Sequence, residues 1–376
     1  MNDEKEITTM NDRIDSTLAL KPFATGKPNT KLADDGPPVP VPPSKSVIQL
    51  PSDQYLHIGA PTEWWWHIGT LKAGDRIFGF EINAASFGLF GFTQVMLTDV
   101  DNNRHFQQTT PYLPPVFDPK TWAEHDPSKD WVVNLGEVSM HAPQSDPTKN
   151  MTVTAGLTDG ETNTTVKFDL TLSQEGLPFI VWGTGVHPNP PPEPDLQHNN
   201  FYYSLTRLKA SGSISIGDEK FDVTGITWMD HEYGLFGTQE DRPKWILQDM
   251  QLDNGVCISN YSIEPPELRK KIASLATVQR ADGTTYFVNS FVTPTGPTWT
   301  SPASGVTYYM ELEVEIPAFK ATLLVTSLVD SQEFSSKIKG GSVYEGVASA
   351  SGTFEDETVS GTAWNEQTLP PTTDPS

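Results

Sequence analysis

The sequence has 376 residues, with 25 basic and 48 acidic side chains and a formal net charge of -23 at pH 7. This charge repels phosphate backbones and anionic lipid surfaces, so we expect neither a nucleic-acid partner nor binding to a membrane surface. The single cysteine, Cys257, excludes an internal disulfide and a cysteine-rich zinc site. The length allows two domains or one large all-β body.

The first 46 residues are polar and then rich in proline, and they predict a disordered or polyproline-like arm. Acidic residues interrupt the N-terminus and leave no apolar core of a secretion signal. No later segment approaches about 18 uninterrupted apolar residues. We therefore expect a soluble, cytoplasmic protein with no stable membrane insertion.

The first clear strand is predicted at Glu63-Trp64-Trp65-Trp66-His67. Because successive side chains of a strand point to opposite faces, Trp64 and Trp66 are expected on one face and Glu63, Trp65 and His67 on the other. One face then belongs to the core and the other to a cavity wall, unless all three tryptophans fill the core.

Alternating apolar and polar residues between turn residues predict further strands. In the first half of the chain these cover residues 77–82, 94–100, 151–158, 167–172 and 199–208. Residues 110–127 hold Pro, Phe and Trp without a period and predict a long loop, which in a compact domain is often a lid or a site wall. Residues 186–195 are too rich in proline for a helix or a central strand.

The second half repeats the β pattern. Residues 244–252 and 256–261 flank a turn that contains Asn254-Gly255, which suits the positive φ values of a tight hairpin turn. Residues 308–316 form the clearest predicted strand, and the last strands are expected at 342–354 and 358–364. No segment has the apolar stripe of a three-turn helix. The predicted class is therefore all-β, with antiparallel barrels or sandwiches.

The candidate site is the charged stretch Trp228-Met229-Asp230-His231-Glu232-Tyr233, just past the midpoint of the chain. An acid among aromatic rings loses hydration, so its pKa rises and it can act as a general acid near neutral pH. The alternative is a polar turn whose acids are solvated or cap backbone amides. The candidate catalytic residues are Asp230, His231 and Glu232. The candidate substrate-binding residues are Glu63, Trp65, His67, Tyr202, Tyr203, Trp228 and Tyr233.

Such a site can protonate an alkene or a carbonyl, with aromatic faces stabilising the cation, or it can hold an apolar ligand unchanged. Other chemistries lack their motifs. The eight histidines are scattered, no glycine-rich phosphate loop follows a strand, and no Gly-x-Ser-x-Gly nucleophile elbow is present. We therefore expect neither a metal nor a cofactor.

The chain resembles the carotenoid 1,2-hydratase superfamily over about residues 48–368. This superfamily includes the AttH-like proteins, fungal kievitone hydratase and, more distantly, lipocalin-like fungal pericyclases. The matching motifs are Glu63-Trp64-Trp65, Phe78-Gly79-Phe80-Glu81, a Tyr-Tyr-Ser-x-x-Arg-Leu strand at 202–208, an Asp-His-Glu-aromatic turn at 230–233, a Trp-to-Gly hairpin at 245–255, and Tyr344-Glu345-Gly346.

The resemblance implies two lipocalin-like β-domains side by side, with the site in or near the pocket between them. Here these domains are residues 47–234 and 235–368, followed by a tail at 369–376. The resemblance also implies that Asp230 protonates an isoprenoid double bond, that Tyr203 and Trp228 are pocket aromatics, and that His231 and Glu232 set protonation and place water.

The chain departs from the carotenoid hydratases at two places. Phe201 and Tyr203 stand where a His-x-Trp pair is expected, and Tyr233 replaces a tryptophan. We therefore predict a cofactor-independent hydratase or cyclase that acts on an alkene of a hydrophobic isoprenoid or polyketide-like small molecule. The alternatives are a lipocalin-like carrier of such a molecule and a pericyclase of secondary metabolism. The substrate and the oligomeric state stay open.

Overall fold

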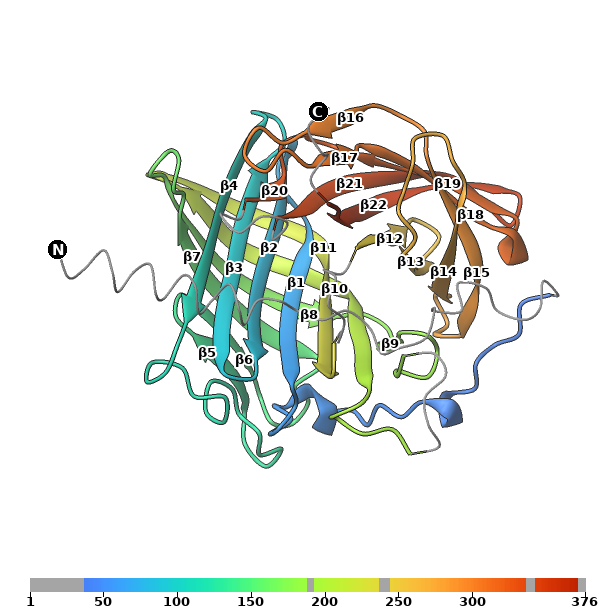
Figure 1. The fold of residues 1–376 in the computed structure, drawn as a ribbon. Coiled ribbons are helices and arrows are strands. Elements are labelled where there is room, and N and C mark those ends of the chain that lie inside the picture. Colours follow the sequence, from blue (N-terminus) through green and yellow to red (C-terminus); the bar gives the residue numbers. More distant parts are fainter. Residues whose placement is uncertain (1–36, 188–192, 237–243, 336–341, 371–376) are drawn as a thin grey trace.

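The computed structural model describes residues 37–187, 193–236, 244–335 and 342–370, which form two β domains side by side (Figure 1). Within these ranges the helices are three short 3-10 turns, Pro43–Lys45, Ser52–Gln54 and Pro317–Phe319. The all-β prediction is confirmed, and so is the prediction of two lipocalin-like domains.

The first domain is an antiparallel sheet of 11 strands that curves into a half-barrel. Its order is β4-β3-β2-β1-β11-β10-β8-β7-β6-β5, with β9 paired to β10. The inner face encloses an apolar core that includes Trp65, Phe80, Leu170 and Tyr203. The strands are β1 (Thr62–Ala73), β2 (Arg76–Phe87), β3 (Phe90–Asp99), β4 (Arg104–Tyr112), β5 (Trp131–Leu135), β6 (Val138–Ala142), β7 (Asn150–Thr158), β8 (Thr165–Gln174), β9 (Phe179–Ile180), β10 (Asn200–Ile216) and β11 (Glu219–Gly234).

The second domain is a closed barrel of eight strands, because β19 pairs with both β18 and β21. Its order is β19-β18-β15-β14-β13-β12-β22-β21, while β20 pairs with β21 and β16 pairs with β17. The barrel has its own apolar core, separate from that of the first domain. The strands are β12 (Trp245–Leu252), β13 (Cys257–Ser262), β14 (Ile272–Gln279), β15 (Thr285–Pro294), β16 (Thr298–Thr300), β17 (Thr307–Tyr309), β18 (Glu311–Ile316), β19 (Ala321–Ser327), β20 (Glu333–Phe334), β21 (Val343–Phe354) and β22 (Glu357–Thr368).

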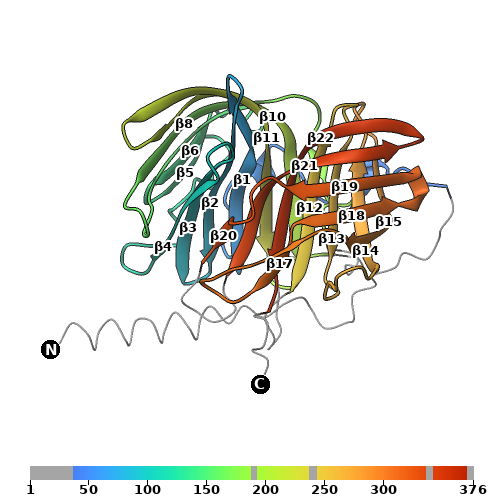
Figure 2. The same cartoon turned by 90° about the horizontal axis from the view of Figure 1, so that it is seen from above.

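The two domains pack through their outer faces. β1 lies against β22, and β2 lies against β21 (Figure 2). A third apolar cluster joins Trp66 and Trp228 of the first domain to Val347 and Trp364 of the second. Trp64 also packs against this interface cluster, whereas Trp65 belongs to the inner core. The predicted alternation along β1 is therefore confirmed, and its outer face is the domain interface.

Gly79 on β2 allows the close approach of the two domains. A Cβ atom at this position would lie 2.4 Å from Cβ of Val347 on β21. We expect Gly79→Ala to lower the free energy of unfolding by about 1 to 3 kcal/mol, the usual cost of overpacking. Urea denaturation measures this change. Gly156→Ala on β7 is the control, because its Cβ would meet nothing closer than 3.7 Å. Equal losses in the two variants would contradict the close-approach argument.

Residues 37–46 were predicted to be part of a disordered arm. Residues 37–46 have defined contacts with the second domain, where the Val41 N–H donates to the carbonyl of Thr285 at 2.8 Å and Pro40 forms a β-bridge with Tyr286. Proline is compatible with such pairing at a strand edge, because its carbonyl still accepts and the following residue still donates. Residues 1–36 of the predicted arm, 188–192 of the proline-rich loop and 371–376 of the tail lie outside the described residues.

The strand predicted over 308–316 is two strands. β17 pairs with β16 and β18 pairs with β15 and β19, with a break at Met310. The alternation of side chains continues across a change of partner strand, so the sequence pattern does not show the break. The predicted long loop after β4 is present, but Phe117 and Trp122 on it pack into the core of the first domain.

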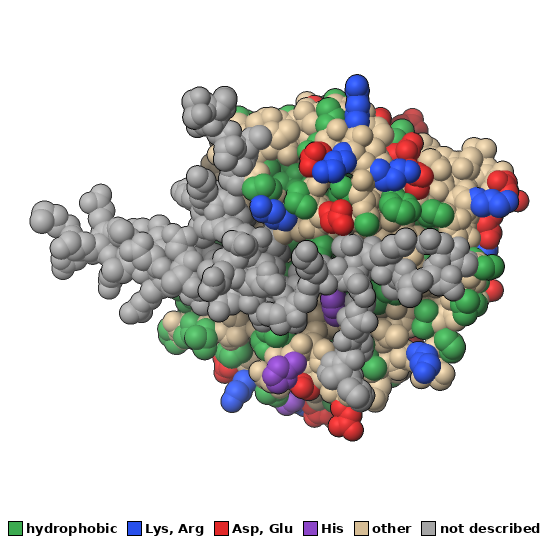
Figure 3. All heavy atoms as spheres, turned by 45° about the vertical axis from the view of Figure 1, so that its right-hand side comes forward, with side chains coloured by type: hydrophobic (Ala, Val, Ile, Leu, Met, Phe, Trp, Pro, Cys, Tyr) green, Lys and Arg blue, Asp and Glu red, His purple; other side chains and the backbone are tan. Residues whose placement is uncertain are grey.

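The described residues include no helix long and apolar enough to span a membrane. Figure 3 shows acidic and basic side chains interspersed over the upper part of one face of the molecule. The net negative charge is therefore not one continuous acidic patch on the described surface of that face.

Candidate functional site at the domain interface

The adjacent candidates Asp230, His231 and Glu232 lie within strand β11 rather than in a turn, so they point to alternating faces. Asp230 is opposite Trp66 of β1 and faces the second domain. His231 is opposite Trp65 and faces the core of the first domain. The structure therefore brings Asp230 and Glu232 together on the interface and places His231 on the other side of the sheet.

The same alternation divides the predicted substrate-binding residues. Trp228 and Tyr202 belong to the interface cluster, close to Asp230. The other five face the inside of the first domain, away from Asp230. They are Glu63, Trp65, His67, Tyr203 and Tyr233.

The Asp230 carboxyl is fully buried between the domains. Its Oδ1 atom accepts hydrogen bonds from the Ser204 hydroxyl and, at 2.7 Å, from the indole N–H of Trp228. Within the described part of the chain, Oδ2 has no hydrogen-bond partner. Burial raises the pKa of Asp230 to about 6, against the lowering effect of these donors. One oxygen is thus fixed in place and the other is left to carry a proton.

Five more carboxyls, four buried and that of Glu232 half-buried, lie at the interface with Asp230 and interact with it or with Glu366, and three of them come from the second domain. We call these residues the acid cluster: Glu81, Asp230, Glu232, Asp249, Glu345 and Glu366. Burial, followed by repulsion from Asp230, raises the pKa of Glu366 to about 8 and holds that of Asp249 well above its usual range. The pKa of every member of the acid cluster is therefore raised, because adjacent charges in an apolar interface are costly.

Indole N–H groups hold the acid cluster in place. Trp228 donates to Asp230 at 2.7 Å, Trp364 donates to Glu345 at 2.8 Å, and Trp245 donates to Glu366. Each of these carboxyls therefore lies beside an aromatic ring. Such rings stabilise positive charge, so the interface combines proton donors with surroundings that favour a carbocation.

The carboxyls of the second domain were not predicted as site residues. Asp249, Glu345 and Glu366 lie on three different strands, and each one alone resembles an ordinary surface acid in an alternating strand. The sequence offers one signal for a buried acid, because Asp249 follows shortly after the apolar run Trp245-Ile246-Leu247. The structure adds that Glu345 stands opposite Glu366 across β21 and β22. These features indicate site residues only when the packing of the two domains is known.

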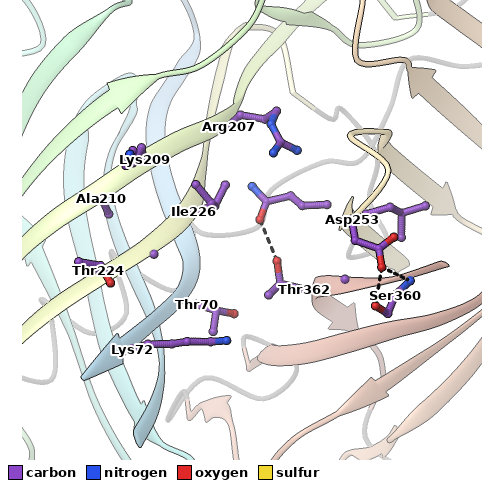
Figure 4. Close-up of a pocket in the computed structure, with 14 residues that line it drawn as sticks. Thr70, Lys72, Arg207, Lys209, Ala210, Thr224, Ile226, Asp253, Ser360 and Thr362 are labelled. Carbon is purple, nitrogen blue, oxygen red and sulfur yellow. Dashed lines mark hydrogen bonds between the residues drawn. The ribbon is translucent and has the colours of Figure 1, made fainter. Parts of the chain in front are cut away.

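A groove with a volume of about 470 Å³ opens at one end of the same interface (Figure 4). β1, β10 and β11 form one wall, and β12 and β22 form the other. Ile226, which lines the groove, and Asp230 lie on the same face of β11, four residues apart. The groove and the acid cluster therefore lie along one continuous strip between the domains.

Gln251 connects the two domains at this groove. Its Nε2 group donates to the carbonyls of Thr206 and Thr227 in the first domain, and its Oε1 accepts from Thr362 at 3.0 Å. We expect Gln251→Ala to lower the unfolding free energy by about 1 to 3 kcal/mol, since two partly buried carbonyls lose their donor. Thermal and urea denaturation measure the loss. Gln144→Ala, which removes an exposed amide, is the control, and an equal loss there would contradict this role.

The inner face carries a separate polar network. Glu63 accepts hydrogen bonds at Oε1 from Nδ1 of His57 at 2.8 Å and from Nε2 of His231 at 3.0 Å. Burial lowers the pKa of His57, but hydrogen bonds to Asp53 and Glu63 outweigh it and raise the pKa to about 9. Among the described residues, His57, Glu63 and His231 are the one group whose donor atoms are close enough to hold a metal ion. Hydrogen bonds already satisfy Glu63, so we interpret the group as a structural network.

His67 is buried on the same inner face. Neither ring nitrogen has a hydrogen-bond partner in the described residues. Burial lowers the pKa of His67 to about 3, so the ring is neutral. We interpret His67 as a core residue of the half-barrel rather than as a proton donor.

The fold and the site between its domains define a two-domain lipocalin-like β protein. A sequence profile of the AttH-like family matches residues 41–368, and the chain belongs to this family. The predicted resemblance to the AttH and kievitone hydratase superfamily is therefore confirmed.

Two solved structures have the same fold. An AttH protein from Nitrosomonas europaea is 21% identical with a TM-score of 0.69, over 88% of this chain and 99% of that one. Kievitone hydratase from Nectria haematococca is 17% identical with a TM-score of 0.65, over 93% of this chain and 98% of that one. No curated protein matches the chain by sequence. At these identities the similarity concerns the fold.

Proposed function

We propose that the protein is a hydratase, or a cyclase that uses the same protonation, acting on an alkene of a hydrophobic isoprenoid or polyketide-like molecule. The observation that carries the proposal is Asp230, fully buried and fixed at one oxygen by Ser204 and Trp228. A carboxyl with a pKa of about 6 has the proton affinity of a general acid that works near neutral pH. Membership of the AttH-like family and a fold shared with kievitone hydratase support this class.

In the proposed reaction the π electrons of the alkene take the proton of Asp230. A C–H bond forms at the less substituted carbon, a tertiary cation forms at its neighbour, and Asp230 becomes a carboxylate. The ring of Trp228, beside Asp230, stabilises the cation. In a hydratase, water then forms the C–O bond and its surplus proton passes back to the carboxylate. In a cyclase, a second alkene forms a C–C bond with the cation, and loss of a proton restores Asp230.

The second domain would position the water. Asp249 is buried, interacts electrostatically with Asp230 and lies near Ser259, but neither of its oxygens has a hydrogen bond of good geometry in the described ranges. An unpaired buried carboxyl is costly, so a polar ligand that hydrogen-bonds it is favoured there. Glu232 lies on the same face as Asp230 and is held by a hydrogen bond from the Asn200 side-chain amide at 2.7 Å, whereas His231 lies on the opposite face and takes no direct part.

The test is incubation of the purified protein with a panel of isoprenoid and polyketide-like alkenes in deuterated water. A hydratase yields a product that has gained water and carries one deuterium bound to carbon, as read by mass spectrometry and NMR. A pericyclase yields a cyclised product without carbon-bound deuterium. If every bound alkene is recovered unchanged, the protein is a carrier and the enzymatic proposal is refuted.

A further inference from the structure

The groove of Figure 4 has the opposite charge to the rest of the chain. Lys72, Arg207 and Lys209 line it together with a single acid, Asp253. Both the backbone N–H and the hydroxyl of Ser360 donate to Oδ2 of Asp253, at 3.2 and 2.7 Å, so this carboxylate is already engaged. Although the chain has a net charge of -23, the groove has three cations and one acid, and that acid is already hydrogen-bonded. The groove is therefore a local site of positive potential.

The cations of the groove are not neutralised by protein carboxylates. Among the described residues, Lys72 and Arg207 form no ion pair, and Lys209 lies 4.0 Å from Glu175 with both side chains largely exposed. Exposed pairs of this kind contribute little, typically about 0 to 1 kcal/mol. The positive groups of the groove therefore remain available to an anionic ligand.

A buried hydroxyl in the wall of the groove points to a ligand independently of charge. Thr70 is 6% exposed and lines the groove, yet its Oγ1 has no hydrogen-bond partner among the described residues. Buried polar groups are nearly always paired, so an unpaired hydroxyl in a cavity wall favours a polar ligand there. Thr70 lies two residues from Lys72 on the same face of β1, so one ligand group can contact both.

The groove also lies at a fixed distance from the proposed acid. Asp230 is four residues from Ile226 on β11, which corresponds to roughly 13 Å along a strand. Between them, on the same outer face, are the apolar side chains of Trp228 on β11 and Ile68 on β1. A ligand that extends from the groove to Asp230 would therefore have a polar end and an apolar body.

We infer that this groove binds the anionic group, a carboxylate or a phosphate, of an amphipathic molecule whose hydrocarbon part reaches toward Asp230. The inference names the substrate class of the proposed hydratase or cyclase and in that respect rests on that function. Arg207 and Lys72 would bind the anion by charge-assisted hydrogen bonds, with the hydroxyl of Thr70 as a further partner.

The experiment compares three probes with the same hydrocarbon part, geranic acid, geranyl phosphate and neutral geraniol, by isothermal titration calorimetry. We expect the two anions to bind at least about tenfold more tightly than geraniol, since hydrogen bonds to charged groups contribute about 1.5 to 3 kcal/mol. A stronger gain for geranyl phosphate than for geranic acid identifies a phosphate, and the reverse order identifies a carboxylate.

The double variant Lys72→Gln/Arg207→Gln is expected to bind all three probes with the affinity of geraniol. Lys149→Gln, which removes one exposed lysine outside the groove, is the control and should keep the preference. The inference fails if geraniol binds as tightly as the anions, if the double variant keeps the preference, or if Lys149→Gln loses it equally.

The outcome is separable from that of the proposed function. Asp230→Asn leaves the groove intact, so it should bind the anions with the same preference while its turnover is lowered. Anion preference in a protein that leaves every alkene unchanged would support the groove and refute the enzyme. Turnover of neutral alkenes without any anion preference would support the enzyme and refute the anion-binding groove.

Discussion

Asp230→Asn is expected to lower turnover by about 10²- to 10⁴-fold, the usual contribution of a general acid, while ligand affinity changes by only a few-fold. The asparagine carbonyl can still accept hydrogen bonds from Ser204 and Trp228, so the side chain keeps its position. The amide that replaces Oδ2 has no proton acidic enough to transfer to an alkene. The variant therefore separates proton donation from binding.

The measurement is the rate of deuterium incorporation into the alkene that the panel identifies, together with calorimetric affinity for the same molecule. Asp222→Asn is the matched control, because Asp222 is an exposed aspartate on the same strand. Unchanged turnover in Asp230→Asn would remove the acid hypothesis. Loss of affinity in parallel with turnover would instead assign Asp230 a role in anchoring the ligand, as expected for a pericyclase.

Raising the pH from 6 to 8 is expected to destabilise the protein through the acid cluster. The folded state raises the pKa of Glu366 to about 8, while the unfolded chain has a value of about 4.3. The folded protein therefore holds a proton that the unfolded chain has released. This contribution is complete below pH 4 and is lost as the pH rises through 8. One group with this shift loses roughly 2 kcal/mol of stability between pH 6 and pH 8.

Glu366→Gln isolates this effect from other titrating groups. Glutamine stays neutral and still accepts the hydrogen bond from Trp245, so stability should fall less steeply with pH than in the unmodified protein. Urea denaturation at pH 6 and pH 8 gives the two slopes. Glu357→Gln, an exposed change on the same strand, is the control. Equal slopes in the Glu366 variant and the unmodified protein, or greater stability at pH 8, would refute the argument.

The fold could be predicted from local patterns because each strand carries its own signal. Trp64, Trp65 and Trp66 are a clear case, since a period of two residues is enough to assign the outer face and the inner face. The same period applied to Asp230 and His231 would have separated them, but three adjacent charged residues suggested a turn. The period of two residues does not reveal the break between β17 and β18 at Met310, because the side chains keep alternating where the chain changes its partner strand.

The acid cluster could be predicted only in part. Asp230 has aromatic neighbours in the sequence, and its desolvation was foreseeable. Asp249 and Glu366 come close to Asp230 through the packing of two separately folded sheets, a relation that no local spacing encodes. The groove was missed for the same reason, because Lys72, Arg207 and Lys209 look like solvated surface residues until the barrel supplies the opposite wall.

The closure of the second domain has a consequence for solubility. Its ring of strands has no free edge, whereas the sheet of the first domain ends at β4 and β5. β20 of the second domain lies against β4, so domain contact covers part of one of these edges. An uncovered edge strand is a template for pairing with another chain. Whatever separates the domains, such as alkaline pH or a bulky residue at Gly79, should therefore promote aggregation through the half-barrel before the closed barrel unfolds.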